Sequence, residues 1–260
     1  DKEWTPRNYG DEYDGPIPLR RALAMSRNVA AVKLAETIGF DRIAGLWRRV
    51  GTATPPLAVP AITLGVFETT PWEVAEAYTL FANQGEIQPL RLVLGMKQGD
   101  TPLPLQPAPA RRRIARVDST FLVTSMMESV MDEGTGAGAR VAGLVQPLAG
   151  KSGTTNDLRD AWFVGFSPEL LTVVWVGRDD NQVLGLSGAQ AALPIWTNFM
   201  KRALSGQPQT AFLAPAEGLV QATIDRDTGL LAEPGCPRIL METFAAGTEP
   251  REFCHLHTYH

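Results

Sequence analysis

Apolar residues recur at helical spacing in several separate stretches of the chain. The first covers residues 19–38, and polar Ser26 and Asn28 interrupt it. Thr70 and Pro71 form a typical helix start, because a threonine hydroxyl can cap the helix and proline suits its first position. The predicted helices are therefore residues 19–38, 41–50, 70 to about 85, a segment from Asp118 as its cap to residues 134–138, and Ala192–Ala203.

The apolar pattern changes to short β-type runs in the second half of the chain. Residues 148–153, 160–166 and 170–176 are rich in Val, Trp and Phe and are separated by turns. They predict an antiparallel meander, which the helix Ala192–Ala203 would cover on one face. A further short strand is predicted at residues 91–96. The expected fold class is therefore α+β, an antiparallel sheet flanked by helices.

Polar segments that lack periodicity predict loops between these elements. Residues 4–18 are rich in Pro, Gly, Tyr and Asp and predict an extended surface loop. Residues 98–110 are rich in proline and predict another surface loop. The basic run 111–113 follows, and we interpret it as a solvated turn.

The chain changes in composition near its end. Beyond Ser205 it is rich in Pro, Gly and Thr, with candidate strands at residues 219–224 and 239–243. A segment this short could bury little apolar area on its own. We therefore expect a main domain of residues 1–207 and a C-terminal β-rich extension of residues 208–260.

The bulk composition excludes several classes of protein. The 260 residues are 44% hydrophobic, enough to bury a substantial core. Lysine and arginine number 24 against 28 acidic residues, so the net charge of -4 favours no nucleic-acid partner. No stretch reaches the roughly 18–20 consecutive apolar residues that a membrane-spanning helix requires.

Cysteine and histidine gather in the last part of the chain. Cys236 and Cys254 could form a disulfide or remain free thiols, and the sequence leaves both possibilities open. His255, His257 and His260 lie beside Cys254, a group that could bind zinc. A frayed terminus is the favoured interpretation, so we expect no metal site and no cofactor.

The segment Lys151-Ser152-Gly153-Thr154-Thr155 concentrates chemistry at the start of the predicted sheet. The lysine can attract an anion or a developing oxyanion, and the hydroxyls can bind a carboxylate. Gly153 would allow a substrate backbone to lie close to the strand. The alternative is a solvent-facing turn between strands.

A second polar group, Ser26-Arg27-Asn28, breaks the first predicted helix. Taken alone it could simply cap a helix. However, Ser-x-x-Lys, Ser-Asp-Asn and Lys-Thr-Gly form the three-part signature of penicillin-recognising serine enzymes. Ser26-x-Asn28 and Lys151-Ser152-Gly153 follow the order of the last two parts.

Longer stretches around these motifs resemble class A penicillin-binding proteins. The stretches are WTPRNY (4–9), RALAMSRN (21–28), TTPWEVA (69–75), FANQG (81–85), KSGTTND (151–157) and RDAWFVG (159–165). The tail, with FAAGTEP at residues 244–250, resembles the C-terminal extension of the bifunctional glycosyltransferase-transpeptidases. The resemblance therefore covers nearly the whole chain and implies a penicillin-binding/serine β-lactamase-like fold, incomplete at the N-terminus.

One part of the signature is absent from the chain. None of the lysines has a serine three residues before it; they are Lys2, Lys33, Lys97, Lys151 and Lys201. In the family, the acylating Ser-x-x-Lys motif precedes the segment that corresponds to residue 1. We therefore expect a fragment, a cleavage product or one part of a split assembly, inactive by itself.

The resemblance implies a D,D-transpeptidase that joins peptidoglycan stem peptides and that β-lactam antibiotics acylate. It would lie on the periplasmic face of the bacterial inner membrane, with its membrane anchor and glycosyltransferase domain in the segment that is missing here. The implied catalytic residues are Ser26, as a proton relay, and Lys151. The implied substrate-binding residues are Asn28, Ser152, Gly153, Thr154 and Thr155, and the backbone N–H of Thr154 would belong to an oxyanion hole.

Two other functions remain open. The chain could be a non-catalytic binding or scaffold module with the same fold. It could also be a β-lactamase, which would need a base to activate water, and Glu128, Asp132 and Glu133 are available for that role.

Overall fold

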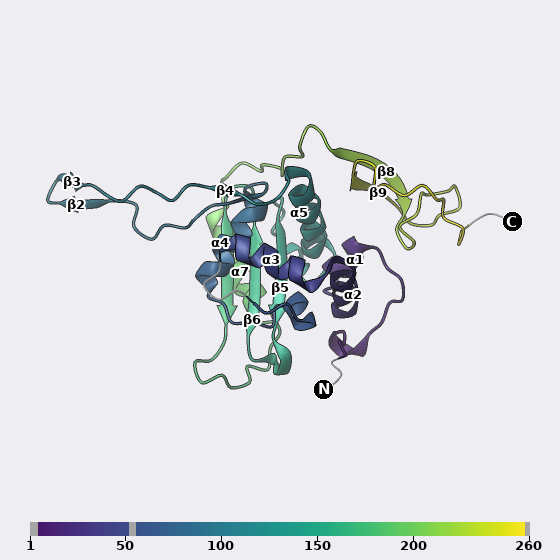
Figure 1. Ribbon diagram of the computed structural model, residues 1–260, viewed down its shortest axis with the longest axis horizontal. Coiled ribbons are helices and arrows are strands. Elements are labelled where there is room, and N and C mark those ends of the chain that lie inside the picture. Colours follow the sequence, from purple (N-terminus) through teal and green to yellow (C-terminus); the bar gives the residue numbers. More distant parts are fainter. Residues whose placement is uncertain (1–4, 52–55, 258–260) are drawn as a thin grey trace.

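The computed structural model describes residues 5–51 and 56–257, and its centre is an antiparallel sheet (Figure 1). The sheet comprises β5 (Ala149–Thr154), β6 (Ala161–Phe166) and β7 (Leu171–Val176), in the order β5-β6-β7. Lys151 pairs with Val164, which pairs in turn with Val173. The predicted meander is therefore confirmed.

Helices surround this sheet. Their bounds are α1 (Leu19–Ala24), α2 (Asn28–Ile38), α3 (Phe40–Val50), α4 (Pro71–Ala82), α5 (Val117–Asp132), α6 (Gly138–Val141) and α7 (Ala192–Ala203). Short 3-10 helices lie at Tyr9–Asp11, Pro60–Leu64 and Asn156–Leu158. None of the helices in the described ranges is both long and apolar enough to cross a membrane.

The two faces of the sheet pack against different helices. Phe163 of β6 is fully buried against Trp196 of α7, with ring centroids 5.0 Å apart. Phe166, three residues further along β6, points to the opposite face and packs in a cluster with Met127 of α5 and Tyr78 of α4. Helices therefore cover both faces of the sheet.

The predicted helices agree with the structure, with two local differences. The helix expected at residues 19–38 is divided into α1 and α2, because Ser26 has a φ of 55° that no α-helix contains. Thr70 caps α4 as expected, in a reciprocal capping box with Glu73. Asp118 does not cap α5. The N-cap is Arg116, and Asp118 is a buried residue of the first turn that is paired with Arg116.

The prediction of a strand at residues 91–96 is wrong. Instead, β1 (Glu86–Ile87) pairs with β4 (Arg112–Arg113), and β2 (Met96–Gln98) pairs with β3 (Thr101–Leu103) across a Gly99-Asp100 turn. Gly99 has a φ of 61°, which a two-residue hairpin turn with glycine first requires. The region that was expected to be a proline-rich loop therefore contains a hairpin.

The basic run is also more ordered than a solvated turn. Arg112 and Arg113 form β4, and the Arg112 guanidinium donates to the carbonyls of Arg49 and Val50, at 2.8 Å each. These carbonyls lie in the last turn of α3, where the helix leaves acceptors without helical partners.

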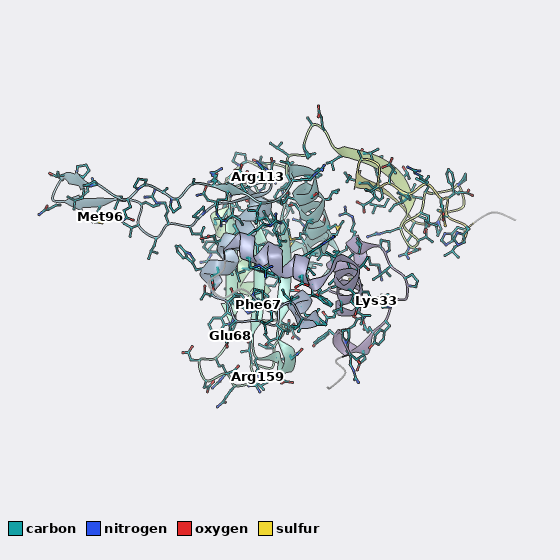
Figure 2. The ribbon with its side chains drawn as sticks, viewed as in Figure 1. Lys33, Phe67, Glu68, Met96, Arg113 and Arg159 are labelled. Atoms are coloured by element: carbon teal, nitrogen blue, oxygen red, sulfur yellow. The ribbon has the colours of Figure 1, made fainter. Side chains whose placement is uncertain are left out.

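Residues 91–110, here called the arm, extend away from the rest of the molecule (Figure 1). Met96 lies far out on the arm, whereas Arg113 lies beyond its base and Lys33 on the far side of the body (Figure 2). The side chains of Leu92 and Leu94 are 85% and 79% exposed. The arm therefore contributes little to the core.

The C-terminal segment forms a small two-stranded unit at the opposite end from the arm (Figure 1). Here β8 (Leu219–Asp225) pairs with β9 (Ile239–Ala245), which confirms the candidate strands at 219–224 and 239–243. Arg20 of α1 connects this unit to the body through a double hydrogen bond to the Glu242 carboxylate, at 2.6 and 2.5 Å. A domain boundary between residues 207 and 208 remains our proposal.

Candidate active site

Ser26 lies in the tight turn between α1 and α2. The turn is closed by backbone hydrogen bonds from Ser26 to the Leu23 carbonyl (3.1 Å) and from Arg27 to the Ala22 carbonyl (2.9 Å). The backbone of Ser26 is left-handed, with φ of 55°, a conformation that residues other than glycine seldom adopt. The fold therefore holds the serine in a strained position, which is common for residues at functional sites.

Lys151 reaches this turn from β5. Its ammonium nitrogen donates to the Ser26 hydroxyl at 2.7 Å and to the Ser152 carbonyl at 3.0 Å. The two residues are 125 positions apart in the sequence, and the fold brings their side chains into direct contact. Loss of water around the buried ammonium lowers the pKa of Lys151 from 10.5 to about 8, so the group stays mainly protonated at pH 7.

Asn28, the first residue of α2, contacts the N-terminal loop. Its side-chain amide donates to the Arg7 carbonyl at 2.9 Å, while Asn8 accepts from the backbone N–H of Val29 at 3.0 Å. Both contacts fix the start of α2 beside the Ser26 turn.

Arg27, between Ser26 and Asn28, secures the same loop. Its Nε lies 2.5 Å from Asp14 and its Nη2 lies 3.2 Å from Glu12. The hydrogen bond from Arg27, with the further hydrogen bond and charge of Arg21, lowers the pKa of Asp14. The loop over the Ser26 turn is therefore held by ion pairs as well as by backbone contacts.

The hydroxyls after Lys151 are directed by separate contacts. Ser152 shares a hydrogen bond of 2.7 Å with the hydroxyl of Thr135, in the turn between α5 and α6. Thr154 accepts from the backbone N–H of Gly188 at 3.0 Å, so its own proton is available to a ligand. Lys151 and Ser152 thus contact different elements, as side-chain alternation along a strand requires.

Thr155 lies one residue beyond β5 and faces Asp160. Its hydroxyl donates to the Asp160 carboxylate at 3.3 Å and accepts from the Asp160 backbone N–H at 2.8 Å. These two hydrogen bonds join Thr155 to Asp160 and help to close the turn after β5.

The outer edge of β5 offers free backbone groups. Thr155 donates its N–H to the carbonyl of Asp160, the residue before β6, at 3.1 Å. Because N–H directions alternate along an antiparallel strand, the N–H of Thr154 points away from β6. Within the described part of the chain β5 has no strand on that side. An extended peptide or a single oxyanion could therefore bind there.

Three residues that contact the site were not predicted from the sequence. Thr135 was assigned only to a helix-breaking stretch, and its position between Gly134 and Gly136 was the available signal. Gly188 lies so close to β5 that an added Cβ would be 2.4 Å from the Gly153 carbonyl oxygen. Arg7 acts through its carbonyl group, for which a sequence carries no signal.

In the ranges that the structure describes, one cluster of His, Cys and acidic side chains could hold a metal ion, and it lies in the C-terminal unit. The active-site region instead combines an ammonium group, several hydroxyls and an open strand edge. This set suits acyl transfer from a peptide that carries a carboxylate.

Comparison with known families agrees with this chemistry. Residues 1–201 match the family described as penicillin binding protein transpeptidase domain. Residues 215–259 match the family described as penicillin-binding protein 1A, C-terminal domain.

Individual proteins are similar over most of the chain. Penicillin-binding protein 1A of Aquifex aeolicus is 36% identical over 256 residues, 97% of this chain and 34% of that protein. The chain thus spans about a third of the length of this curated relative.

Solved structures share the fold. The crystal structure of penicillin-binding protein 1A from Haemophilus influenzae superposes with a TM-score of 0.87 at 30% identity, covering 98% of this chain and 43% of that one. Penicillin-binding protein A from M. tuberculosis, solved as a penicillin G acyl-enzyme complex, superposes with a TM-score of 0.59 at 25% identity, covering 76% and 51%.

Proposed function

Because this chain belongs to the penicillin-binding protein transpeptidase family, we propose that it carries the proton relay and the substrate-binding edge of a peptidoglycan D,D-transpeptidase. The observation that carries the proposal is the 2.7 Å contact between the Lys151 ammonium and the Ser26 hydroxyl. The nucleophilic serine would come from a Ser-x-x-Lys segment outside these 260 residues, since none is present within them.

The reaction would proceed in two acyl transfers. The nucleophilic serine attacks the penultimate D-Ala carbonyl of a stem peptide, and the bond to the terminal D-Ala nitrogen breaks. The lysine of the Ser-x-x-Lys segment would accept the proton of the attacking serine, while Ser26 donates its hydroxyl proton to the leaving nitrogen and regains one from Lys151. An amine of a second stem peptide then attacks the acyl-enzyme and forms the cross-link. The amine gives its proton through Ser26 back to Lys151, and the lysine of the Ser-x-x-Lys segment returns its proton to the freed serine.

The backbone of β5 would bind the acyl donor. The outward N–H of Thr154 would donate to the oxyanion together with the N–H of the nucleophilic serine, and one such donor is worth about 3 kcal/mol to the transition state. The hydroxyls of Ser152 and Thr154 would bind the terminal carboxylate, and Thr155, whose hydroxyl is hydrogen-bonded to Asp160, would fix the turn beside them. Gly153 would let the peptide backbone approach, and Asn28 would hydrogen-bond the donor amide.

The same site would accept β-lactams, which imitate the acyl donor and leave a stable acyl-enzyme. The penicillin G acyl-enzyme of the M. tuberculosis relative supports this extension. By the same analogy, the whole protein would act at the periplasmic face of the inner membrane, with a glycosyltransferase domain and an anchor outside this chain.

A labelled penicillin tests the proposal. We expect no stoichiometric adduct on the 260-residue chain, but one adduct on a longer product of the same gene that includes Ser-x-x-Lys. In that longer protein, Lys151→Ala should slow acylation by roughly 10²–10⁴-fold, the range for a lost acid-base group. Lys97→Ala, which removes an exposed lysine of the arm, is the matched control and should leave the rate unchanged. A stoichiometric adduct on the 260-residue chain would contradict the proposal.

The two alternative functions predict other results. A scaffold module would leave cell-wall cross-linking unchanged when Lys151→Ala is introduced into the whole protein. A β-lactamase would release hydrolysed penicillin with turnover. Of its candidate bases, Asp132 is paired with Arg140 and Glu133 with Arg226, which makes neither free to activate water.

A further inference from the structure

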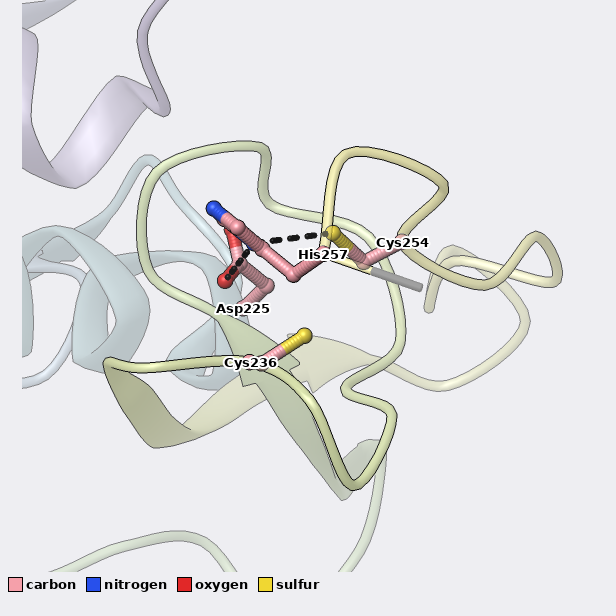
Figure 3. A group of neighbouring side chains, drawn as sticks. All are labelled: Asp225, Cys236, Cys254 and His257. Carbon is pink, nitrogen blue, oxygen red and sulfur yellow. Dashed lines mark hydrogen bonds and ion pairs between the residues drawn. The ribbon is translucent and has the colours of Figure 1, made fainter. Parts of the chain in front are cut away.

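Four side chains with metal-ligating atoms converge in the C-terminal unit (Figure 3). They are Asp225 at the end of β8, Cys236 in the connection to β9, and Cys254 and His257 beyond β9. Their ligand atoms all lie within 4.8 Å of one another. The cluster is remote in sequence from Ser26 and Lys151 and does not depend on the proposed function.

The backbone brings these residues together without help from their side chains. Cys254 donates its N–H to the Leu231 carbonyl at 2.8 Å, and Leu231 donates to the Glu252 carbonyl at 2.9 Å. The frayed terminus expected from the sequence is therefore wrong up to His257, and Cys254 is 1% exposed. His260 lies outside the described residues.

Asp225 is oriented as a ligand would be. Its Oδ1 accepts from the N–H of Asp227 and from the N–H and hydroxyl of Thr228, at 2.9 to 3.1 Å. Its Oδ2 is buried and accepts no hydrogen bond, although the Nδ1 of His257 is 3.1 Å away. Metal-ligating carboxylates typically have one oxygen held by such contacts while the other binds the ion.

One ring nitrogen of His257 lies near two other side chains of the cluster. Its Nδ1 is 3.1 Å from the Asp225 carboxylate and 3.4 Å from the Cys254 sulfur. A ring nitrogen carries either one proton or one lone pair, so it cannot satisfy both neighbours fully. A cation between the three atoms would accept electron pairs from all of them.

The dimensions suit a tetrahedral zinc ion. Zinc binds sulfur at about 2.3 Å and nitrogen or oxygen at about 2.0–2.2 Å, which places neighbouring ligand atoms roughly 3.3–3.8 Å apart. The two separations from His257 Nδ1, 3.1 Å to Asp225 and 3.4 Å to Cys254, are near this range. The widest separation, at most 4.8 Å, requires a closure of about 1 Å.

The described part of the C-terminal unit also has little apolar core of its own. Among the described residues after 207, Ile224 and Cys254 are the buried apolar ones, whereas Ile239, Met241 and Phe253 are exposed. A two-stranded sheet is marginally stable alone, and small units with little core usually require a disulfide or a metal ion. Both cysteines are free thiols in the structure.

We propose that Asp225, Cys236, Cys254 and His257 bind a structural Zn²⁺ that stabilises the C-terminal unit. Two thiolates with an imidazole favour zinc over magnesium or calcium, which prefer oxygen ligands. Four protein ligands would fill a tetrahedral ion, which is characteristic of structural rather than catalytic zinc sites.

The test uses the 260-residue chain, purified under reducing conditions and without chelator. Elemental analysis should find one zinc ion per chain, and cobalt replacement should give the visible bands of a tetrahedral thiolate site. His257→Ala should weaken Zn²⁺ binding by more than about 100-fold, because loss of a second-shell partner alone costs roughly 10–100-fold. His255→Ala removes a neighbouring exposed histidine outside the cluster and is the matched control.

Added Zn²⁺ should also raise the melting temperature of the metal-free chain and of His255→Ala, but not that of His257→Ala. Three results would overturn the proposal: reduced, folded chain that takes up no zinc; equal zinc affinity in the two histidine variants; or a Cys236–Cys254 disulfide found by mass spectrometry in the protein isolated from its native compartment. Circular dichroism establishes that each variant is folded before its affinity is compared.

Discussion

Ser26 depends on its backbone as much as on its hydroxyl. A left-handed conformation is more costly for a β-branched residue than for serine. We therefore expect Ser26→Thr to lower the free energy of unfolding by about 1–2 kcal/mol, although it keeps the hydroxyl. Denaturant unfolding measures this, with Ser205→Thr at an exposed position as control. Equal stability of the two variants would show that the Ser26 turn is not strained.

Lys151 links stability to pH. Its pKa is about 8 in the folded chain and 10.5 when unperturbed, so between these values the unfolded state binds more protons. The contribution of Lys151 to the free energy of unfolding therefore increases as pH rises from about 8 to 10.5.

Lys151→Met removes the titration of this ammonium group. The difference between the unchanged chain and the variant therefore separates that titration from the titration of the other groups. The melting temperature of the unchanged chain minus that of Lys151→Met should increase from pH 7 to pH 10. A difference that is constant over this range would mean that the ammonium is not desolvated.

Site residues were predictable from the sequence only where their chemistry forms a local motif. Lys151, with its neighbouring hydroxyls, and Ser26 stand in short recognisable patterns. Thr135 and Gly188 contact the site through the folded arrangement of distant segments, and the glycines on either side of Thr135 indicate a turn but not its contact with Ser152. The sequence did not predict a metal site around Cys254 and His257, because Asp225 and Cys236, which complete the cluster, lie in other parts of the tail.

At the level of elements, periodicity predicted the helices and the central meander because each has a strong local pattern. The prediction of a strand at residues 91–96 is wrong because the strands of this region depend on their pairing partners and not on a local pattern. The short strand β1 is defined by its partner β4, with Glu86 opposite Arg113, and nothing in either segment alone indicates that pairing. Hydrophobic runs predict a strand only where another strand is present to receive its hydrogen bonds.

Gly134 lies where α1 and the end of α5 approach closely, and a side chain at this position should destabilise the fold. A Cβ on Gly134 would lie 2.2 Å from the Ala24 carbonyl oxygen, two residues before Ser26. Gly134→Ala should therefore lower the free energy of unfolding by about 1–3 kcal/mol, as overpacking does. In the longer protein it should also slow acylation by penicillin.

Gly95→Ala provides the matched control for this change. Its Cβ would meet no heavy atom within 4 Å, so stability should be unchanged or slightly higher. If both variants behaved alike in chemical denaturation, the contact between α1 and α5 would not be restrictive.

For the molecule as a whole, Arg20 joins the C-terminal unit to the body. Its guanidinium binds Glu242 of β9 and also the Ser125 carbonyl of α5, at 2.6 Å. Both charged side chains are largely buried, 14% and 9% exposed. Each would be costly to leave without its partner.

Glu242→Ala should therefore lower the free energy of unfolding by about 3–5 kcal/mol and expose the C-terminal unit to limited proteolysis. Glu217→Ala, which removes an exposed carboxylate near the same unit, should have little effect. Replacing both Arg20 and Glu242 by leucine should recover part of the loss. Unchanged protease resistance in Glu242→Ala would show that other contacts hold the unit in place.

The arm provides a place where foreign sequence can be added. Its ends meet where β1 pairs with β4, and its tip is the exposed turn at Gly99 and Asp100. Lengthening a surface loop costs only about 0.6 kcal/mol per doubling. A reporter peptide inserted between Gly99 and Asp100 should leave the melting temperature nearly unchanged, and a large fall would show that the tip is needed for folding. The chain could then carry a label at a point that lies far from Ser26 and Lys151.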